Sequence, residues 1–172
     1  MTTSPQNFVT YQGQKIPLHS KEDFEGMRKA GRLASRTLDF IAPYIEPGIS
    51  TGKIDQLCHD FMVNHGAIPA TLGYKGYTKS CCTSVNHVVC HGIPSHEKIL
   101  KEGDIVNIDV TPIVDGWYGD TSRMFSVGKT SILAKRLIDV TYEAFSQAIS
   151  IVKPGITLGD IGYTIQKIAE SN

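Results

Sequence analysis

The spacing of apolar residues along the chain predicts a series of amphipathic helices. Apolar residues recur at intervals of three and four positions after Ser20, after Thr51 and again after Thr130. Ser20 is a favourable N-cap residue, and the two acids that follow it in the first turn suit the helix dipole. Pro43 is expected to end the first helix, and the sequence Asn-His-Gly at 64–66 is expected to end the second.

The middle of the chain has a different pattern. Between residues 70 and 128, short β-rich runs alternate with turn residues. Residues 85–91 are predicted to form one strand. Residues 104–114 and 117–127 are predicted to form a hairpin, because Asp115-Gly116 is among the strongest short hairpin signals.

A short internal repeat suggests how these segments are organised. Residues 45–54 resemble residues 152–161, and in each copy a predicted helix precedes a Pro-Gly turn and another follows it. Chance similarity between two Pro-Gly turns is the alternative. The repeat favours an α+β domain of two similar halves, the first over residues 20–128 and the start of the second over residues 129–172. Residues 1–19 show little periodicity and are predicted to form an N-terminal surface arm.

Composition and charge narrow the classes of function. Of the 172 residues, 41% are hydrophobic, and 17 Lys and Arg residues balance 17 Asp and Glu residues. This balance does not favour DNA or an anionic membrane as the main partner, and no apolar run is long enough to span a bilayer. The first residues lack the blocks of a signal peptide, and the four cysteines form no Cys-x-x-Cys pair. We therefore expect a cytoplasmic protein with reduced thiols.

Two aspartates in the predicted hairpin are candidate metal ligands. With a two-residue turn at Asp115-Gly116, Thr111 lies opposite Asp120, and Asp109 shares the face of Thr111. The two acids are then diagonal neighbours with Cα atoms about 7–8 Å apart. Their carboxylates could converge on one ion, or on two ions about 3.5–4 Å apart. The alternative is that both are solvated or are paired with Arg123 or a lysine.

His91 is a candidate for contact with a substrate. It follows an apolar run and precedes Gly92-Ile93-Pro94, which places it at the end of a predicted strand beside a tight turn. A histidine in that position could donate a hydrogen bond to a substrate carbonyl or to a developing oxyanion. The alternative is a structural role, which is the more common role of a lone histidine at the end of a strand.

The sequence Gly-Tyr-Lys-Gly-Tyr at residues 73–77 predicts an irregular loop that presents two aromatic rings. Tyr74 and Tyr77, with the polarisable sulfur of Cys82 nearby, could line a pocket for an unbranched apolar side chain. The alternative is that the rings serve only the packing of the loop. Without other evidence, the residues of this loop favour that interpretation.

Together these segments resemble the methionine aminopeptidases of the bacterial type I family, from about Ser20 to the end of the chain. The combination of Cys-His-Gly-Ile-Pro, Asn-Ile-Asp-Val and Gly-Asp-Thr-Ser is highly specific. The stretches that carry the resemblance are Gly73–Ser80, Ser84–Pro94, Asp104–Val110 and Asp115–Ser122. The resemblance implies the pita-bread fold, in which two pseudo-symmetric αβ halves surround a central antiparallel sheet.

The resemblance also implies an activity. It is the metal-dependent removal of the initiator methionine from nascent proteins and peptides, by attack of a metal-activated hydroxide on the first peptide bond. Asp109 would chelate one of two divalent metal ions, and Asp120 would bridge both. The ions would be cobalt, manganese, iron or zinc, among which oxygen-rich sites discriminate poorly. His91 would contact the substrate and assist the movement of a proton or of charge.

The substrate implied by the resemblance is the N-terminal methionine of a nascent polypeptide. Its pocket would be lined by Tyr74, Tyr77, Cys82 and Thr71. Thr71 departs from the family pattern, because many members carry a further cysteine there. The family also allows transient association with the ribosome, and the full-length protein is expected to be a monomer without DNA or membrane partners.

The chain departs from the family in one large respect. The family site also uses a histidine and two glutamates from the second half, so the chain supplies two of five protein ligands. Residues 1–172 alone are therefore expected to have little or no activity. One alternative is a proline-directed enzyme of the same fold, such as aminopeptidase P or prolidase, against which the tyrosine-rich loop argues. The other is a non-catalytic pita-bread binding protein. The two aspartates and His91 argue against it, whereas the missing second half of the site argues for it in this chain.

Overall fold

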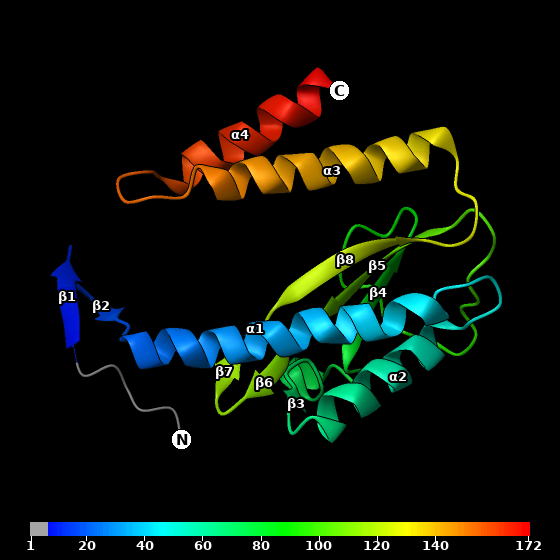
Figure 1. Ribbon diagram of the computed structural model, residues 1–172, viewed down its shortest axis with the longest axis horizontal. Helices are drawn as coiled ribbons and strands as arrows, with labels where there is room; N and C mark the ends of the chain where they lie inside the picture. The colour runs from blue at the N-terminus through cyan, green and yellow to red at the C-terminus, as the bar shows by residue number, and fades with distance from the viewer. Residues whose placement is uncertain (1–6) are drawn as a thin grey trace. The chain divides into compact units, whose positions relative to one another are not determined.

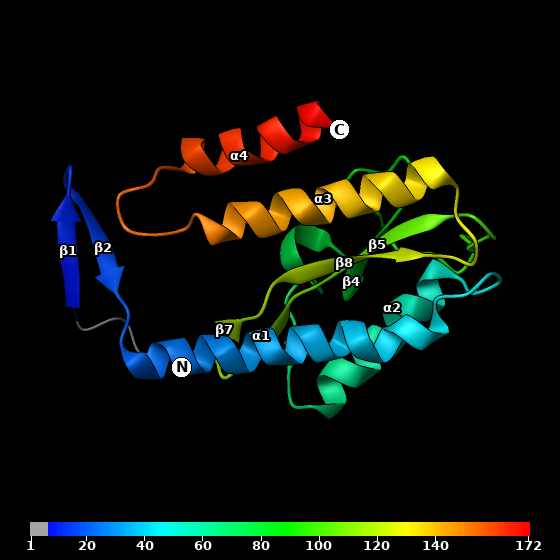
Figure 2. The same cartoon turned by 45° about the horizontal axis from the view of Figure 1, so that its top comes forward.

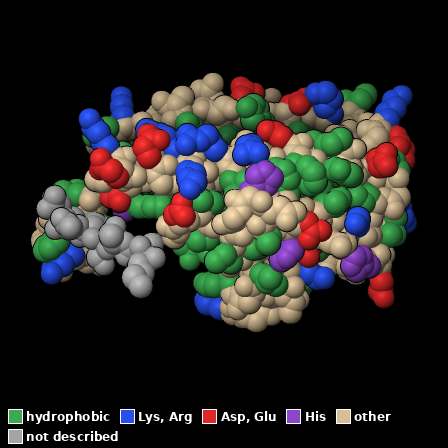
Figure 3. Space-filling view, turned by 60° about the horizontal axis from the view of Figure 1, so that its bottom comes forward, with side chains coloured by type: hydrophobic (Ala, Val, Ile, Leu, Met, Phe, Trp, Pro, Cys, Tyr) green, Lys and Arg blue, Asp and Glu red, His purple; other side chains and the backbone are tan. Residues whose placement is uncertain are grey.

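The computed structural model describes residues 7–172, which form two compact units divided after Gly128 (Figure 1). Helices and antiparallel sheets are both present, which confirms the predicted α+β class. None of the helices within residues 7–172 has the length and apolar character needed to cross a membrane. On the face shown in Figure 3, acidic and basic side chains are interspersed, in agreement with the balanced charge.

The described part of the first unit contains two α-helices and three small antiparallel sheets. The helices are α1 (Lys21–Ile41) and α2 (Thr51–Asn64). The strands, grouped by sheet, are β1 (Asn7–Tyr11) and β2 (Gln14–Leu18); β3 (Ile68–Pro69), β6 (Pro112–Val114) and β7 (Trp117–Tyr118); and β4 (Cys81–Val85), β5 (Ile105–Val110) and β8 (Thr121–Ser126).

The predicted N-terminal arm contains a hairpin that the periodicity did not indicate. Strands β1 and β2 pair across a turn at Gln12-Gly13, where φ is 48° and 79°. Positive φ at both central residues is typical of a type I′ turn. The signal is weak in the sequence because glutamine, rather than asparagine or aspartate, occupies the first turn position. Residues 1–6 of the predicted arm lie outside the described residues.

The helix boundaries follow from their caps. Ser20 and Asp23 form a reciprocal capping box, in which the Ser20 Oγ accepts from the Asp23 N–H at 3.2 Å and the Asp23 carboxylate accepts from the Ser20 N–H at 2.8 Å. Helix α1 ends before Pro43, as predicted. Helix α2 begins one residue earlier than predicted, because Ser50 is its N-cap and accepts from the Lys53 N–H at 3.1 Å.

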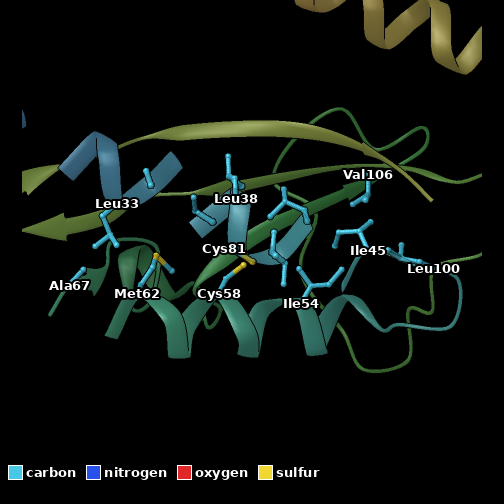
Figure 4. Packing of buried hydrophobic residues seen from close by; sticks show 14 of the residues in the cluster. Leu33, Leu38, Ile45, Ile54, Cys58, Met62, Ala67, Cys81, Leu100 and Val106 are labelled. Atoms are coloured by element: carbon cyan, nitrogen blue, oxygen red, sulfur yellow. The ribbon is translucent and has the colours of Figure 1, made fainter. Parts of the chain in front are cut away.

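Helices α1 and α2 lie against one face of the β4–β5–β8 sheet (Figures 1 and 2). Val106, Ile108 and Val110 of β5 are fully buried in the resulting core. Leu38 of α1 and Ile54 of α2 belong to the same cluster (Figure 4). Because side chains alternate along a strand, the odd-numbered residues of β5 face away from this core.

The second unit is the helix pair α3 (Ile132–Ser150) and α4 (Leu158–Ser171), and its local structure repeats that of α1–α2. Gly48 and Gly155 occupy equivalent turn positions with φ of 101° and 96°. Ser50 and Thr157 are the N-caps of the helices that follow, and both of these helices have 14 residues. The sequence repeat therefore corresponds to a repeat of helix, turn, cap and helix.

The two helix pairs differ in how much they bury. In α3 only Ala144 and Ala148 are buried, and α4 has no buried residue. Between α3 and α4 lies an apolar groove of about 680 Å³. Its lining includes Leu133, Leu137, Phe145, Ile149, Ile161 and Ile165. An exposed apolar surface of this kind is typical of a face that another protein surface covers.

Gly119 sets how closely α1 approaches the hairpin, which gives a test of this packing. A Cβ atom at Gly119 would lie 2.2 Å from the Ala30 carbonyl oxygen, whereas a Cβ atom at Gly31 would meet nothing within 4 Å. We predict that Gly119→Ala lowers the free energy of unfolding by about 1–3 kcal/mol. Gly31→Ala, within the helix, should raise it by roughly 0.5–1 kcal/mol. Urea denaturation measures both changes, and equal effects would contradict this packing.

Candidate functional site

The register of the hairpin decides which side chains share a face. Asp115 and Gly116 have φ of 51° and 86°, as a type I′ turn requires, and the strands close directly around them. Further from the turn, Asp109 of β5 pairs with Ser122 of β8. The register is the same on both sides of the intervening residues, so the sequence-based alignment of this hairpin is correct. Asp120 therefore lies on the face of Asp109.

The two long strands predicted for this hairpin are each interrupted. Thr111 separates β5 from β6, and its carbonyl accepts from the Ala70 N–H at 2.8 Å instead of joining the ladder. Pro112 has no N–H to donate, and its carbonyl accepts from the Gly119 N–H at 3.0 Å. Residues 119 and 120 separate β7 from β8. The interruption places Asp120 on an exposed irregular segment beside the sheet.

Asp109 and Asp120 are close enough to interact directly. Burial raises the pKa of Asp109 above its usual range, and the negative charge of Asp120 and a hydrogen bond between the two carboxyl groups raise it further. The nearby His91 acts in the opposite direction on the same pKa. The structure thus brings Asp109, Asp120 and His91 together.

Arg123 is not the partner of these acids. It lies on the other face of β8, and its Nη1 donates to Asp39 of α1 at 2.8 Å. The alternative in which Arg123 neutralises Asp109 or Asp120 is therefore wrong. His91 is near Asp109, whereas Arg123 is paired on the other face of the sheet.

The predicted strand over residues 85–91 is wrong, because the strand that precedes His91 is β4, which ends at Val85. Asn86 leaves the strand with φ of 54°, a left-handed conformation that asparagine tolerates. Its side chain holds this turn, since the Asn86 Oδ1 accepts from the Ile105 N–H at 3.0 Å and the Nδ2 donates to Asp104 at 2.9 Å. The following residues form a loop that returns to the edge of β4.

This loop presents His91. Gly92 pairs with the edge of β4, where the Thr83 N–H donates to the Gly92 carbonyl at 2.8 Å and the Gly92 N–H donates to the Ser84 Oγ at 3.1 Å. A Cβ atom at Gly92 would lie 2.2 Å from the Thr83 carbonyl oxygen, so only glycine permits this approach. His91 itself has φ of 55°, a strained value for a residue with a side chain, and it is exposed.

The predicted pocket residues Tyr77 and Cys82 are in contact. The Tyr77 hydroxyl donates to the Cys81 carbonyl at 2.9 Å and lies 3.4 Å from the Cys82 Sγ. Burial is the main cause of a raised pKa for both side chains, which keeps the phenol and the thiol neutral. Cys82 is also the cross-strand partner of Asp109, so this pair adjoins the carboxylates.

Tyr74 and Thr71 are placed differently. Tyr74 is 64% exposed, and its ring lies under the Lys75 ammonium group, 5.4 Å away. The Thr71 Oγ1 donates to the Lys79 carbonyl at 2.9 Å and so closes the base of the loop that carries both tyrosines. Thr71 therefore contacts the loop backbone through its hydroxyl, and Tyr74 projects to the surface.

Sequence reasoning missed two features of the site. Asn107 shares the face of Asp109 and donates to the Ser122 Oγ at 3.3 Å, and the alternation along β5 could have indicated it. Asp55 is 9% exposed on the buried side of α2 and accepts two hydrogen bonds from the start of β4. Its position among apolar helix residues was the available signal.

The carboxylates fit a divalent metal in part. Two adjacent acids, one with a pKa raised by burial and by its neighbour, are electrostatically unfavourable unless a cation lies between them. Carboxylate oxygens are suitable ligands for such ions. Within residues 7–172, however, no group of three or more His, Cys, Asp or Glu side chains is arranged to hold a metal. Further ligands are therefore needed to complete a site.

Comparison with known proteins places these features in a family. The sequence model of metallopeptidase family M24 matches residues 25–172. The methionine aminopeptidase of Rickettsia prowazekii is 59% identical over 157 residues, and that of Escherichia coli K12 is 55% identical over 157 residues. Both matches cover 91% of the chain, which spans 60% of the length of these relatives.

Solved structures agree with these matches. The structure of the Rickettsia prowazekii methionine aminopeptidase has a TM-score of 0.88, covering 91% of this chain and 62% of that one. The Thermotoga maritima methionine aminopeptidase is 38% identical with a TM-score of 0.87, covering 91% of this chain and 63% of that one. An X-Pro aminopeptidase from Thermotoga maritima, 20% identical with a TM-score of 0.77, shares the fold; it covers 89% of this chain and 42% of that one. The expected pita-bread fold is confirmed.

The interaction between the carboxylates predicts how stability depends on pH. A raised pKa in the folded state means that the metal-free protein loses stability as pH rises from the ordinary aspartate value through the raised pKa of Asp109. Asp109→Asn removes this charge, so in a chelator it should raise Tm at pH 7. The gain should shrink as pH falls toward 4. Thermal unfolding between pH 4 and 8 measures both effects.

Asp115→Asn is the control for that measurement. The exposed Asp115 carboxylate accepts a hydrogen bond from Lys29 at 2.6 Å, so its removal should give no gain in Tm. A lower Tm for Asp109→Asn than for the unchanged protein at pH 7 in chelator would show that the two carboxylates do not repel each other.

Proposed function

The chain belongs to metallopeptidase family M24, and from that premise we propose that its function is to remove the N-terminal methionine from peptides and nascent proteins. The observation that carries the proposal is the convergence of Asp109, Asp120 and His91 beside the Tyr77–Cys82 pair. The names of the two curated relatives support methionine as the residue removed.

Asp109 and Asp120 are proposed to hold a pair of divalent metal ions, of cobalt, manganese, iron or zinc. When bound, such a pair polarises a carbonyl group and lowers the pKa of water. A cation held between the carboxylates would offset the burial and the repulsion by Asp120 that raise the pKa of Asp109. Its place on β5, between two paired strands, fixes the direction of its side chain.

His91 is proposed to bind the substrate at the reacting peptide bond. The close pairing of Gly92 with β4 and the left-handed backbone of His91 hold this part of the loop near Asp109. From there the imidazole can donate a hydrogen bond to the substrate carbonyl and stabilise charge that develops on it.

The methionine side chain is proposed to lie against Tyr77 and Cys82. The neutral phenol and thiol offer an apolar, polarisable surface that suits a thioether. Thr71 contributes by closing the loop, and Tyr74 is proposed to reach the pocket rim from its exposed position.

The proposed substrate also implies where the protein works. Nascent chains arise at the ribosome, so we propose a cytoplasmic location with transient contact with ribosomes, and a monomeric full-length protein. Co-sedimentation with ribosomes and analytical ultracentrifugation test these statements. Absence from the ribosome fraction at low salt, or a stable dimer, would contradict them.

Cleavage of a Met-Ala-Ser peptide by the full-length protein with manganese or cobalt tests the proposed activity. Asp109→Asn and Asp120→Asn should lower metal content and turnover together. His91→Ala should lower turnover by about 10²–10⁴-fold while metal content changes little, because the histidine acts on the substrate. Equal losses of metal and turnover would make His91 a ligand, and unchanged metal content in both aspartate variants would refute the ligand assignment.

Residues 1–172 alone are proposed to have little or no activity. Within the described residues no group of three or more His, Cys, Asp or Glu side chains is arranged to hold a metal. Two carboxylates are too few to hold a metal pair in a fixed geometry. The test is the same peptide assay on residues 1–172 with added manganese or cobalt. Turnover comparable to that of the full-length protein would show that the site is complete without further ligands. Binding of the peptide by the full-length protein without turnover would favour the non-catalytic alternative.

A further inference from the structure

Helix α2 holds the start of β4 through a buried carboxylate. The Asp55 Oδ1 accepts from the Ser80 N–H at 2.8 Å and from the Cys81 N–H at 3.0 Å. One helical turn later, the His59 Nδ1 lies 2.8 Å from the Ser80 Oγ. Asp55 is 9% exposed and Ser80 is 3% exposed, so these contacts are largely shielded from water.

The segment that Asp55 holds leads directly to the proposed pocket. The Cys81 carbonyl accepts the hydroxyl of Tyr77, and the next residue is Cys82, whose sulfur lies beside the same hydroxyl. Cys81 also meets Cys58 of α2 in the core (Figure 4). A shift of the backbone at residues 80 and 81 would therefore move the Tyr77–Cys82 contact.

Attaching a helix to a strand through a buried carboxylate has a high energetic cost. Apolar packing would suffice for attachment, whereas a buried acid requires hydrogen bonds to offset the loss of its hydration. The Asp55 carboxylate also provides direction, because one oxygen that accepts from the consecutive N–H groups of Ser80 and Cys81 fixes the orientation of both peptide units.

We propose that Asp55, assisted by His59, is a positioning residue for the specificity pocket. By fixing the backbone at residues 80 and 81, it sets the separation of Tyr77 and Cys82 and so the preference for methionine. This inference rests on the proposed function, and deepens it by naming a residue that determines selectivity without touching the substrate.

The test compares selectivity in full-length variants. The readout is the ratio of kcat/KM for Met-Ala-Ser to that for Leu-Ala-Ser, which does not depend on the fraction of folded enzyme. Asp55→Ala should lower this ratio about tenfold, mainly through KM for the methionine peptide, with metal content unchanged. Asp55→Asn keeps an oxygen acceptor of the same shape and should restore the ratio to within roughly twofold.

Thr37→Ala is the matched control. Thr37 is fully buried in α1, and its hydroxyl donates to the Leu33 carbonyl of the same helix at 2.9 Å rather than to residue 80 or 81. Its removal should lower Tm and leave the selectivity ratio unchanged. A residue that merely stabilises the fold would behave in the same way, so this variant separates stability from positioning.

The possible outcomes test the proposed function and the positioning role of Asp55 separately. If the unchanged full-length protein does not cleave Met-Ala-Ser, the proposed function fails. If it cleaves with a preference for methionine and Asp55→Ala keeps that preference, the positioning role of Asp55 is overturned while the function stands. If Asp55→Ala does not fold, His59→Ala decides, because it removes one contact from a partly exposed residue. A fall of about threefold supports the inference, and an unchanged ratio overturns it.

Discussion

The proximity of two like charges on one face of a β-hairpin is the constraint on which the site depends. Asp109 and Asp120 come together because the Asp115-Gly116 turn fixes the register, and a slip by one residue would place them on opposite faces. The hydrophobic core, which includes neither of these side chains, holds the two carboxylates close together despite their repulsion. Val106, Ile108 and Val110 anchor β5 from the other face.

The rest of the first unit supports this arrangement from several directions. Helix α1 contacts the hairpin at Gly119, next to Asp120, where a Cβ atom would collide with its backbone. Helix α2 holds the beginning of β4 through Asp55, and β4 in turn carries Cys82 opposite Asp109. The loop after Asn86 returns to β4 and brings His91 to the same side. Asp109 and Cys82 thus lie on paired strands, whereas Asp120 lies on the irregular segment before β8 and His91 lies on a strained loop.

The sequence predicted the parts of this site that depend on local rules. The Asp-Gly turn and the two-residue period of strands were sufficient to place Asp109 and Asp120 on one face. The N-cap of α1 followed from Ser20 and the acidic first turn after it. The repeat of helix, Pro-Gly turn and helix appeared in the structure with equivalent caps at Ser50 and Thr157.

The predictions that were wrong concern features that depend on contacts between residues distant in the sequence. The run from Val85 to His91 is apolar enough for a strand, but Asn86 is turned by its bonds to Asp104 and Ile105, which pattern analysis does not show. The long hairpin strands are broken because the Thr111 carbonyl bonds to Ala70. Asp55 lies among apolar residues of a helix, and its N–H partners are about 25 positions away, so its role is visible only in the fold.

We propose that bound metal relieves the repulsion between Asp109 and Asp120. The most direct measurement is a crystal structure of the full-length protein grown with zinc, with anomalous data collected at the zinc edge. We expect an anomalous peak at roughly 2.0–2.2 Å from a carboxylate oxygen of each aspartate, the usual zinc–oxygen distance. A structure in which zinc binds elsewhere, with the two carboxylates apart and in contact only with solvent, would contradict it.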